Sequence, residues 1–270
     1  MTLEGRVAVI TGGGSGIGEA IAARLAKDGA KVAVVDLNES AAKLTADLCG
    51  GIALTADVSD SAAVDRALAA AEEQLGPVDI WVNNAGVGPG AAYGEWMKER
   101  AEQQIAEAAT GTITTPLEGL VRLDDAEWRR MLSVHLDGTF YGTRAAARSM
   151  VARGAGAIVN IASICGIEGC TGHPHYSAAK AGIAGFTRAV AKELILQGVR
   201  VNSVAPGYVD TPLLSSGLTP TLTAVLQLST PQGRLGRPDE IAATVAFLAS
   251  DDASFFVGQN LSPNGGLVTV

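Results

Sequence analysis

Residues 6–18 read RVAVITGGGSGIG. The apolar run from Arg6 to Ile10 indicates a buried strand, and a glycine-rich turn follows it directly. The next segment, residues 19–28, places apolar side chains at helical spacing and stops before Gly29, a typical residue just past a helix end. A strand, a glycine turn and a helix in immediate succession predict a unit whose helix N-terminus can hold an anionic group such as a phosphate.

The same alternation continues along the rest of the chain. Helices are expected at residues 61–75, 176–197 and 239–248, and further strands at residues 31–35, 52–56, 78–82, 157–161 and 199–204. Strands that are apolar throughout, each followed by a helix, indicate a parallel sheet covered on both faces. Because no break in composition divides the chain, we expect one doubly wound α/β domain spanning residues 1–270.

One connection is unusually long for a compact domain, and it covers residues 88–123. It contains an alanine- and glutamate-rich stretch, about residues 91–109, that predicts a helix, followed by a threonine-rich stretch. We interpret residues 88–123 as an insertion that walls the substrate pocket or enlarges a contact between subunits.

The bulk composition excludes several classes of protein and partner. The 270 residues include 33 glycines, about 14 more than average usage gives. The high content of aliphatic residues in the chain nevertheless excludes a disordered protein. A net charge of −8 without a basic run argues against nucleic-acid and membrane partners. The start lacks signal-peptide architecture, so a cytoplasmic protein is expected. The three cysteines, Cys49, Cys165 and Cys170, have no metal-ligand spacing; we expect no metal, reduced thiols and a role for each as a small apolar filler.

The glycine turn has the spacing Gly12-x-x-x-Gly16-x-Gly18, in which glycines let the backbone approach a pyrophosphate. A purely structural turn is the alternative. Asp36 ends the second strand twenty residues after Gly16, where a carboxylate binds the adenosine ribose hydroxyls and repels a 2′-phosphate. This placement favours NAD over NADP. Asp57 and Val58 end the third strand and could reach the adenine edge, although a helix N-cap role for a nearby acid is an equal alternative.

A second group of residues has acid–base potential. Tyr176 and Lys180 stand at i and i+4, on one face of a predicted helix, and a nearby cation stabilises a phenolate. Ser163 follows the fifth strand, where its hydroxyl can bind a carbonyl oxygen. A Tyr-x-x-x-Lys pair alone is common by chance; its occurrence with Ser163, the glycine turn and Asp36 is not.

Together these motifs resemble those of the short-chain dehydrogenase/reductase family, in its compact single-domain branch. The resemblance also rests on Asn83-Asn84-Ala85-Gly86 and Pro206-Gly207-Tyr-Val-Asp-Thr211, and it covers nearly the whole chain except the insertion. It implies a three-layer Rossmann fold with a seven-stranded parallel sheet, a homotetramer, and a substrate lid at about residues 208–236. The implied reaction is hydride transfer at the nicotinamide, with Tyr176 as general acid/base, Ser163 polarising the substrate oxygen, and Lys180 holding the ribose. The cofactor-binding residues that the motifs and the resemblance assign are Gly12, Ser15, Gly16, Ile17, Gly18, Asp36, Asp57, Val58, Asn84, Ala85, Gly86, Tyr176, Lys180, Pro206, Gly207, Val209 and Thr211.

The chain departs from the family pattern at His135, which stands where members usually carry an asparagine of a proton relay. A neutral imidazole offers one donor and one acceptor. We therefore interpret His135 as a fourth relay member that modulates rate without being essential; a helix-packing histidine is the alternative. His173 and His175 precede Tyr176, and we expect them on the surface of a loop.

The functional hypothesis is an NAD-dependent oxidoreductase acting on a hydrophobic secondary alcohol or ketone. It is supported by the absence of charge between Thr211 and Gly233, although lids are generally apolar because they exclude water. A 3-oxoacyl-thioester reductase is the enzymatic alternative, weakened by Asp36 and by Ser15, where NADPH-using relatives often have a basic residue. A non-catalytic NAD-binding sensor or scaffold is the alternative of another class.

Overall fold

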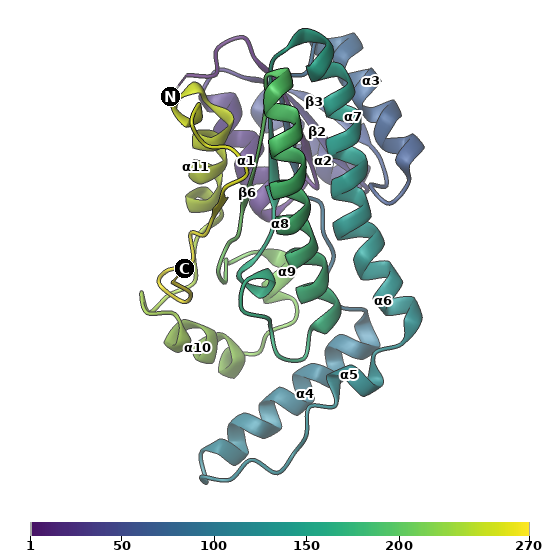
Figure 1. Ribbon diagram of the computed structural model, residues 1–270. Coiled ribbons are helices and arrows are strands. Elements are labelled where there is room, and N and C mark those ends of the chain that lie inside the picture. The colour runs from purple at the N-terminus through teal and green to yellow at the C-terminus, as the bar shows by residue number, and fades with distance from the viewer. Residues whose placement is uncertain (1, 270) are drawn as a thin grey trace.

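The computed structural model of the protein describes residues 2–269 (Figure 1). Its centre is a sheet of seven parallel strands in the order β3-β2-β1-β4-β5-β6-β7. The strands are β1 (Val7–Thr11), β2 (Lys31–Asp36), β3 (Ile52–Thr55), β4 (Ile80–Asn83), β5 (Gly156–Ile161), β6 (Val199–Val204) and β7 (Asn260–Leu261). The predicted seven-stranded doubly wound sheet is confirmed.

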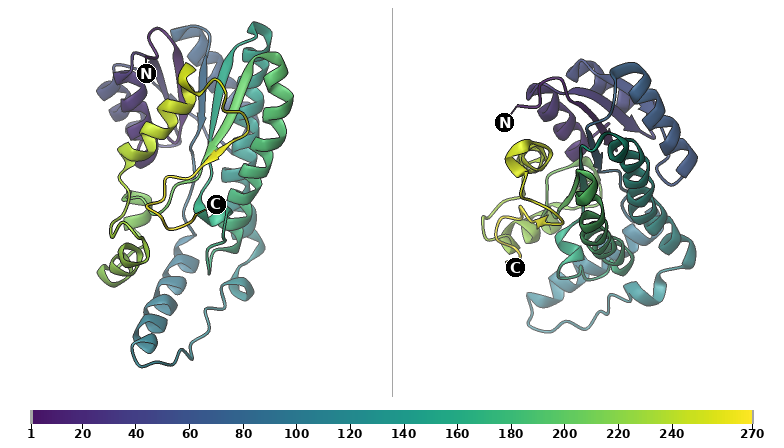
Figure 2. Two further views of the ribbon diagram at one scale, coloured as in Figure 1. Left: turned by 60° about the vertical axis from the view of Figure 1, so that its left-hand side comes forward. Right: turned by 45° about the horizontal axis from the view of Figure 1, so that its top comes forward.

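Helices cover both faces of this sheet, so the fold has three layers (Figure 2). One face packs against α1 (Gly16–Lys27), α2 (Glu39–Cys49) and α11 (Pro238–Ala249). The other face packs against α3 (Ser61–Leu75), α7 (Gly138–Arg153) and α8 (Pro174–Leu194). Successive residues of β1 alternate between the two cores: Ala8 and Ile10 join the first, Val7 and Val9 the second. This two-sided burial explains why the strands are apolar throughout.

The helix ends follow the local sequence. Asn38 caps α2 by accepting the N–H of Ala41 at 3.1 Å, and Asp60 caps α3 by accepting the N–H of Ala62 at 2.9 Å. Gly50 ends α2 in the left-handed conformation that favours glycine. Predicted element bounds differ from the observed ones by a few residues, as in the helix predicted at 239–248 and found at Pro238–Ala249.

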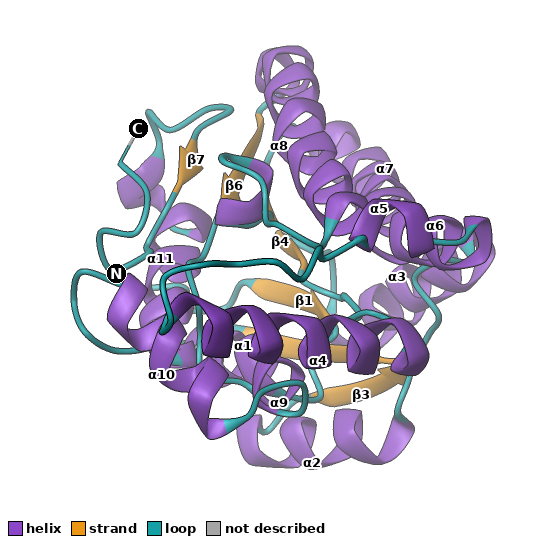
Figure 3. Ribbon diagram, turned by 90° about the horizontal axis from the view of Figure 1, so that it is seen from below, coloured by secondary structure: helices purple, strands orange, loops and turns teal. Residues whose placement is uncertain are grey.

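The segments outside the sheet gather at the carboxyl ends of the strands. Figure 3 shows this end, where α4 (Ala91–Ala108) crosses the field with α9 (Pro212–Ser215) and α10 (Pro220–Ser229) nearby. After α4 the chain returns through a loop to α5 (Gly119–Arg122) and α6 (Asp125–Leu132). The carboxylate of Glu107 accepts the backbone N–H groups of Thr114 and Thr115, which fixes the start of that return. The segment interpreted as an insertion therefore consists of the helix α4, a returning loop and the short helix α5. It lies at the carboxyl ends of the strands.

Candidate active site

The glycine turn follows β1, at the carboxyl ends of the strands. The chain places β2 and β3 on one side of β1 and β4 on the other, so the strand order reverses beside this turn. In open α/β sheets this reversal opens a crevice at the carboxyl ends of the strands. The turn leads directly into α1, whose first N–H groups have no acceptor within the helix. The side chain of Ser15, at the N-cap, makes no capping hydrogen bond, so these groups remain available to a ligand.

Close packing holds the turn in place. A Cβ atom on Gly18 would lie 2.0 Å from the carbonyl oxygen of Gly12, so the third glycine lets helix and strand approach. The side chain of Asn84 donates to the carbonyl oxygens of Thr11 at 3.1 Å and Gly12 at 2.9 Å. Asn84 therefore holds the backbone of the turn through its side chain. The sequence predicted that Asn84 lines the cofactor but did not predict these two hydrogen bonds.

Asp36 contacts the turn through its carboxylate. It accepts the N–H of Gly14 at 2.9 Å through Oδ2 and the N–H of Asn38 at 2.9 Å through Oδ1. The carboxylate thus lies at the tip of β2, against the glycine turn, where the adenosine ribose of a dinucleotide would lie.

The other predicted cofactor residues lie in two kinds of place: some at the carboxyl ends of the strands near the glycine turn, and one, Val58, in the hydrophobic core. Asp57 is exposed and accepts both the N–H of Ser59 at 2.8 Å and its hydroxyl at 2.7 Å, so its carboxylate stabilises the turn before α3. Val58 is buried and belongs to the core beneath α7. Thr211 caps α9 and lies over the glycine turn, 3.3 Å from where a Cβ of Gly16 would be. The remaining residues of this set, Ala85, Gly86, Pro206, Gly207 and Val209, follow β4 and β6 at the same edge.

Ser163, Tyr176 and Lys180 converge beside this crevice. Ser163 follows β5 and is 8% exposed; its Oγ accepts the N–H of Cys165 at 3.1 Å, which leaves the hydroxyl proton free to donate. Lys180, on α8, is 4% exposed and donates from Nζ to the carbonyl oxygen of Ile161 at 2.7 Å. Its Nζ lies 5.5 Å from the centre of the Tyr176 ring.

Burial shifts the pKa of both titrating groups away from the charged form. It lowers the pKa of Lys180 to about 7. Burial also raises the pKa of Tyr176, and the hydrogen bond with Ser163 opposes that rise. Tyr176 is therefore a phenol that holds its proton at neutral pH.

His135 lies next to these residues in a π-helical turn, Ser133–Asp137, between α6 and α7. Such turns within helices occur frequently at functional sites. The imidazole is 2% exposed, and its ring centre lies 5.3 Å from that of Tyr176 in an edge-on arrangement. Nε2 meets the backbone of Val87, with the N–H at 3.1 Å and the carbonyl oxygen at 3.0 Å. Burial, followed by the charge of Lys180, lowers the pKa of His135 to about 3, so the ring is neutral.

Of the two histidines expected on a loop surface, His175 is not there, so that expectation is wrong for it, whereas His173 is half-buried in the loop just before α8. His175 belongs to the first turn of α8 and is fully buried; His173 is the N-cap residue of the same helix. The ring of His175 packs edge-on against Tyr93, and its Nε2 lies 3.5 Å from Oε1 of Glu127. The insertion covers this position, which the local sequence does not reveal.

Sequence reasoning missed the contacts that attach the insertion. Glu127 accepts the N–H of Gly90 at 2.7 Å, and Arg130 donates to the carbonyl oxygen of Gly88 at 2.6 Å. The hydroxyl of Tyr93 lies 2.9 Å from the carbonyl oxygen of Gly119 and 2.7 Å from that of Gly172. The Glu127–Arg130 pair at i and i+3 is an ordinary helix pattern, so no sequence signal distinguishes it.

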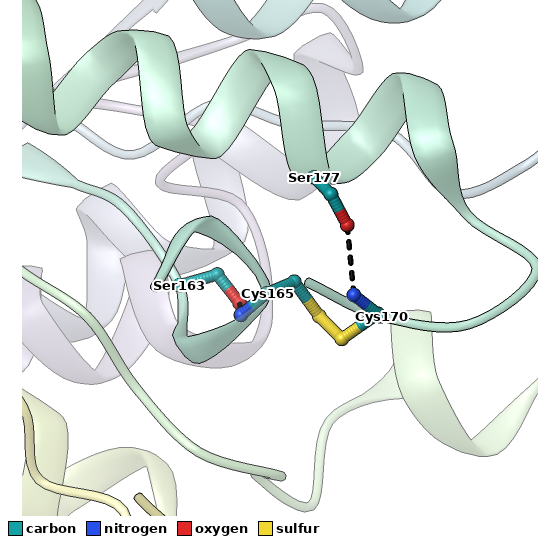
Figure 4. The surroundings of a disulfide bond; sticks show 4 residues. All are labelled: Ser163, Cys165, Cys170 and Ser177. Atoms are coloured by element: carbon teal, nitrogen blue, oxygen red, sulfur yellow. Dashed lines mark hydrogen bonds between the residues drawn. A yellow bond between two sulfur atoms is a disulfide. The ribbon is translucent and has the colours of Figure 1, made fainter. Parts of the chain in front are cut away.

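The expectation of three reduced, space-filling cysteines is also wrong for two of them. Cys165 and Cys170 form a disulfide in this structure, and Cys49 is free (Figure 4). The two residues are only five positions apart, and the chain between them turns back on itself so that their Cα atoms lie 4.8 Å apart.

Among residues 2–269, no helix is long and apolar enough to cross a membrane.

Comparison with known proteins gives relatives over the whole chain. A family model described as short chain dehydrogenase matches residues 6–219. A 3-oxoacyl acyl-carrier-protein reductase of Vibrio cholerae serotype O1 is 36% identical, with 100% of both chains covered. A cis-4-hydroxycyclohexanecarboxylate dehydrogenase of Sinomonas cyclohexanicum is 41% identical over 98% of this chain and 97% of the relative. The crystal structure of a short-chain type dehydrogenase/reductase from Mycobacterium marinum superimposes with a TM-score of 0.84 at 31% identity, covering 100% of this chain and 98% of the other.

Proposed function

The chain belongs to the short-chain dehydrogenase/reductase family, and from that premise we propose that it is an NAD-dependent oxidoreductase acting on hydrophobic secondary alcohols and their ketones. The observation that carries the proposal is the convergence of Ser163, Tyr176 and buried Lys180 beside a glycine turn at the carboxyl edge of the sheet. The family uses a nicotinamide cofactor, and the residues of the turn fit one because a helix N-terminus with free N–H groups meets a backbone that lacks side chains.

The proton chemistry of the proposed reaction falls to Tyr176. The nicotinamide supplies or accepts the hydride when it is bound. The phenol of Tyr176 donates a proton to the carbonyl oxygen during reduction and accepts it back during oxidation. The free hydroxyl proton of Ser163 polarises that same oxygen, and Lys180 places a positive charge beside the phenolate that forms.

Asp36 supports the choice of NAD. Its two carboxylate oxygens are already held by the N–H groups of Gly14 and Asn38, so the charge is fixed at the position of the ribose. A 2′-phosphate there would meet a carboxylate at close range, and such repulsion is worth about 1–4 kcal/mol near a protein surface.

The substrate side is apolar. Leu213 lies within reach of Gly88 at the base of the insertion and is 55% exposed, and Leu228 of α10 is 84% exposed. A hydrophobic ring system matches these side chains. The relative named for a cyclohexane alcohol supports this class, and the relative named for a 3-oxoacyl carrier-protein substrate supports the alternative of a 3-oxoacyl-thioester reductase.

A homotetramer and a cytoplasmic location remain part of the proposal. Helices α7 and α8 lie side by side on one flank of the molecule (Figure 1). Phe140 of α7 is 39% exposed and packs edge-on against Phe186 of α8, with the ring centres 6.1 Å apart. A partly exposed aromatic pair on this flank supports packing of subunits through these two helices.

We also propose that His135 acts as a neutral member of the proton relay. Nδ1 is buried and has no partner among residues 2–269, and a pKa near 3 rules out a charged relay at working pH. We expect His135→Asn, which keeps a donor and an acceptor, to retain kcat within about threefold, whereas His135→Ala lowers kcat by about 10-fold. The measurement is kcat against pH for the three proteins. Equal kcat for His135→Ala and the wild-type enzyme across the pH range would show that the residue only fills space.

The proposed function is tested by initial rates with cyclohexanone, 4-tert-butylcyclohexanone and acetoacetyl-CoA, each with NADH and with NADPH. We expect the cyclic ketones to be reduced faster than the thioester. We further expect kcat/KM to be about 10- to 100-fold higher with NADH than with NADPH, the range that corresponds to about 1.4–2.8 kcal/mol. A thioester rate above both ketone rates would instead favour the 3-oxoacyl-thioester reductase.

Two variants, one a test and one a control, measure whether the Asp36 carboxylate causes the preference for NADH over NADPH. Asp36→Asn removes the charge at the tip of β2, and the NADH preference should fall about 10-fold. Asp47→Asn removes a charge on the exposed face of α2, where the carboxylate pairs with Lys43, and the preference should be unchanged. A preference that survives in Asp36→Asn would contradict the role of this carboxylate.

A further inference from the structure

The disulfide joins the two sides of one short loop beside the proposed catalytic residues. Cys165 lies two residues after Ser163, and its N–H donates to Ser163 Oγ. Cys170 lies near the start of α8, and its N–H donates to Oγ of Ser177, the residue after Tyr176, at 2.9 Å (Figure 4). The bond therefore closes a loop whose two ends contact Ser163 and the neighbour of Tyr176.

The Cys165 end of this loop is fixed. The 3-10 turn Ile164–Gly166 packs on α8 so closely that a Cβ atom on Gly166 would lie 2.5 Å from the carbonyl carbon of Lys180. Cys165 is 8% exposed within this packing. Loss of the disulfide would leave this turn, and Ser163 before it, held by the same contacts.

The Cys170 end is held by hydrogen bonds, from its own N–H to Ser177 Oγ and from the Tyr93 hydroxyl to the carbonyl oxygen of Gly172. Gly169 and Gly172, on either side of Cys170, both have φ of +82°, a conformation that glycine adopts without strain. Cys170 is half-buried. It forms one wall of a pocket of about 420 Å³ with Thr171, Gly172 and residues 117–121 of the insertion. Opening the disulfide would leave this wall with its hydrogen bonds alone, while the Ser163 end keeps its packing against α8.

We propose that Cys165 and Cys170 are a reversible redox modification site, oxidised by a peroxide and reduced by a dithiol, that the oxidised form clamps the wall of this pocket, and that the pocket is part of the substrate site. The kinetic part of this inference rests on the proposed function. Cys170, the more accessible thiol, attacks one oxygen of hydrogen peroxide as its thiolate; the O–O bond breaks, and a sulfenic acid and water result. Cys165 then attacks that sulfur, the S–S bond forms, and the S–O bond breaks to release a second water. The two thiols lose two electrons and two protons to the peroxide, and a dithiol such as dithiothreitol returns both.

The clamp affects binding more than chemistry. If the pocket wall is already ordered before the substrate binds, the entropic cost of ordering it no longer weakens the binding free energy. We expect reduction to raise KM for 4-tert-butylcyclohexanone by about 3- to 10-fold, while kcat stays within about twofold, because Ser163 and Lys180 keep their own packing.

The modification itself is tested without any substrate. Fully reduced protein is treated with hydrogen peroxide, the excess is removed with catalase, and free thiols are counted after unfolding. Three thiols are expected before treatment and one, Cys49, afterwards, with a Cys165–Cys170 cross-link in the peptide masses. Amide exchange in residues 166–173 should be slower in the oxidised form. Cys49→Ser should keep this difference, and Cys170→Ser should lack it.

Other outcomes would overturn the proposal. Three thiols after treatment, oxidation of Cys170 without a cross-link, or cross-links between chains would each exclude the site. A cross-link that changes neither exchange nor KM would exclude the clamp. If the ketones are not turned over at all, the proposed function fails, and the thiol counts and exchange rates still decide whether the site and its clamp exist.

Discussion

Replacing Tyr176 by phenylalanine is expected to lower kcat for ketone reduction by about 10²- to 10⁴-fold, the usual contribution of a general acid. The substitution removes only the phenolic oxygen, so the ring remains packed against His135 at the same edge-on distance. The dissociation constant for NADH should change by less than about threefold, because the glycine turn and Asp36 are untouched. Single-turnover rates and NADH titration by fluorescence measure the two quantities separately.

Tyr141→Phe on α7 is the matched control, since it removes a phenolic oxygen outside the proposed active site. Its kcat and NADH affinity should equal those of the wild-type protein. If Tyr176→Phe keeps kcat within tenfold, Tyr176 is not the general acid. If Tyr176→Phe instead has no turnover but keeps the biological activity of the wild-type protein, the protein acts as an NAD-binding sensor, the alternative of another class.

Replacing Lys180 by methionine is expected to produce a protein that is less active but more stable. Lys180 is buried with no acidic partner among residues 2–269, and its pKa of about 7 shows that the folded protein disfavours the charged ammonium. In the unfolded chain its pKa is about 10.4, so between pH 7 and pH 10 the unfolded state binds more protons. The destabilisation from Lys180 is therefore fully present below pH 7 and is lost as the pH rises towards 10.4.

The size of this effect follows from the shift. A difference of about three pKa units corresponds to about 4 kcal/mol at neutral pH. Loss of the hydrogen bond to the carbonyl oxygen of Ile161 offsets about 1–3 kcal/mol of that gain. We expect Lys180→Met to unfold at pH 7 with a free energy about 1–3 kcal/mol higher and a Tm about 2–10 °C higher. Its kcat should fall at least about 100-fold.

Denaturant unfolding at pH 6 to 10 measures this prediction. The wild-type free energy of unfolding should rise with pH between 7 and 10 relative to that of Lys180→Met. Lys192→Met, on the exposed face of the same helix, should follow the wild-type curve. Parallel curves for Lys180→Met and the wild-type protein would show that Lys180 is not the group responsible, and a lower Tm would show that its hydrogen bond outweighs its buried charge.

Much of the fold was predictable because its signals are local. The strands of a sheet covered on both faces must be apolar throughout, so β1, β2 and β4–β6 stand out in the sequence. The edge strand β7, only two residues long, has no comparable signal. The glycine turn and Tyr176–Lys180 are likewise set by spacing along one segment, and the structure brings them to the same edge.

The features that sequence reasoning missed depend on distant contacts. The burial of His175 results from Tyr93 of the insertion and Glu127 of α6, which pack against it. The pairing of Cys165 with Cys170 depends on the way the chain between them turns back, where Gly169 has a φ of +82°. The low pKa of Lys180 results from burial, which no pattern of neighbouring residues indicates.

The attachment of the insertion has a consequence for how this enzyme could change in evolution. Glu127, Arg130 and Tyr93 bind the insertion and the loop before α8 through backbone atoms of residues 88, 90, 119 and 172. These four positions are glycines, and a Cβ atom on Gly90 would lie 2.9 Å from Oε2 of Glu127, so the anchors depend on these glycines and on Tyr93 but not on the other side chains of the insertion. Many side chains on the insertion could therefore be exchanged while its anchors persist. New substrate preferences could arise there by single substitutions, without passing through an unfolded or inactive intermediate sequence.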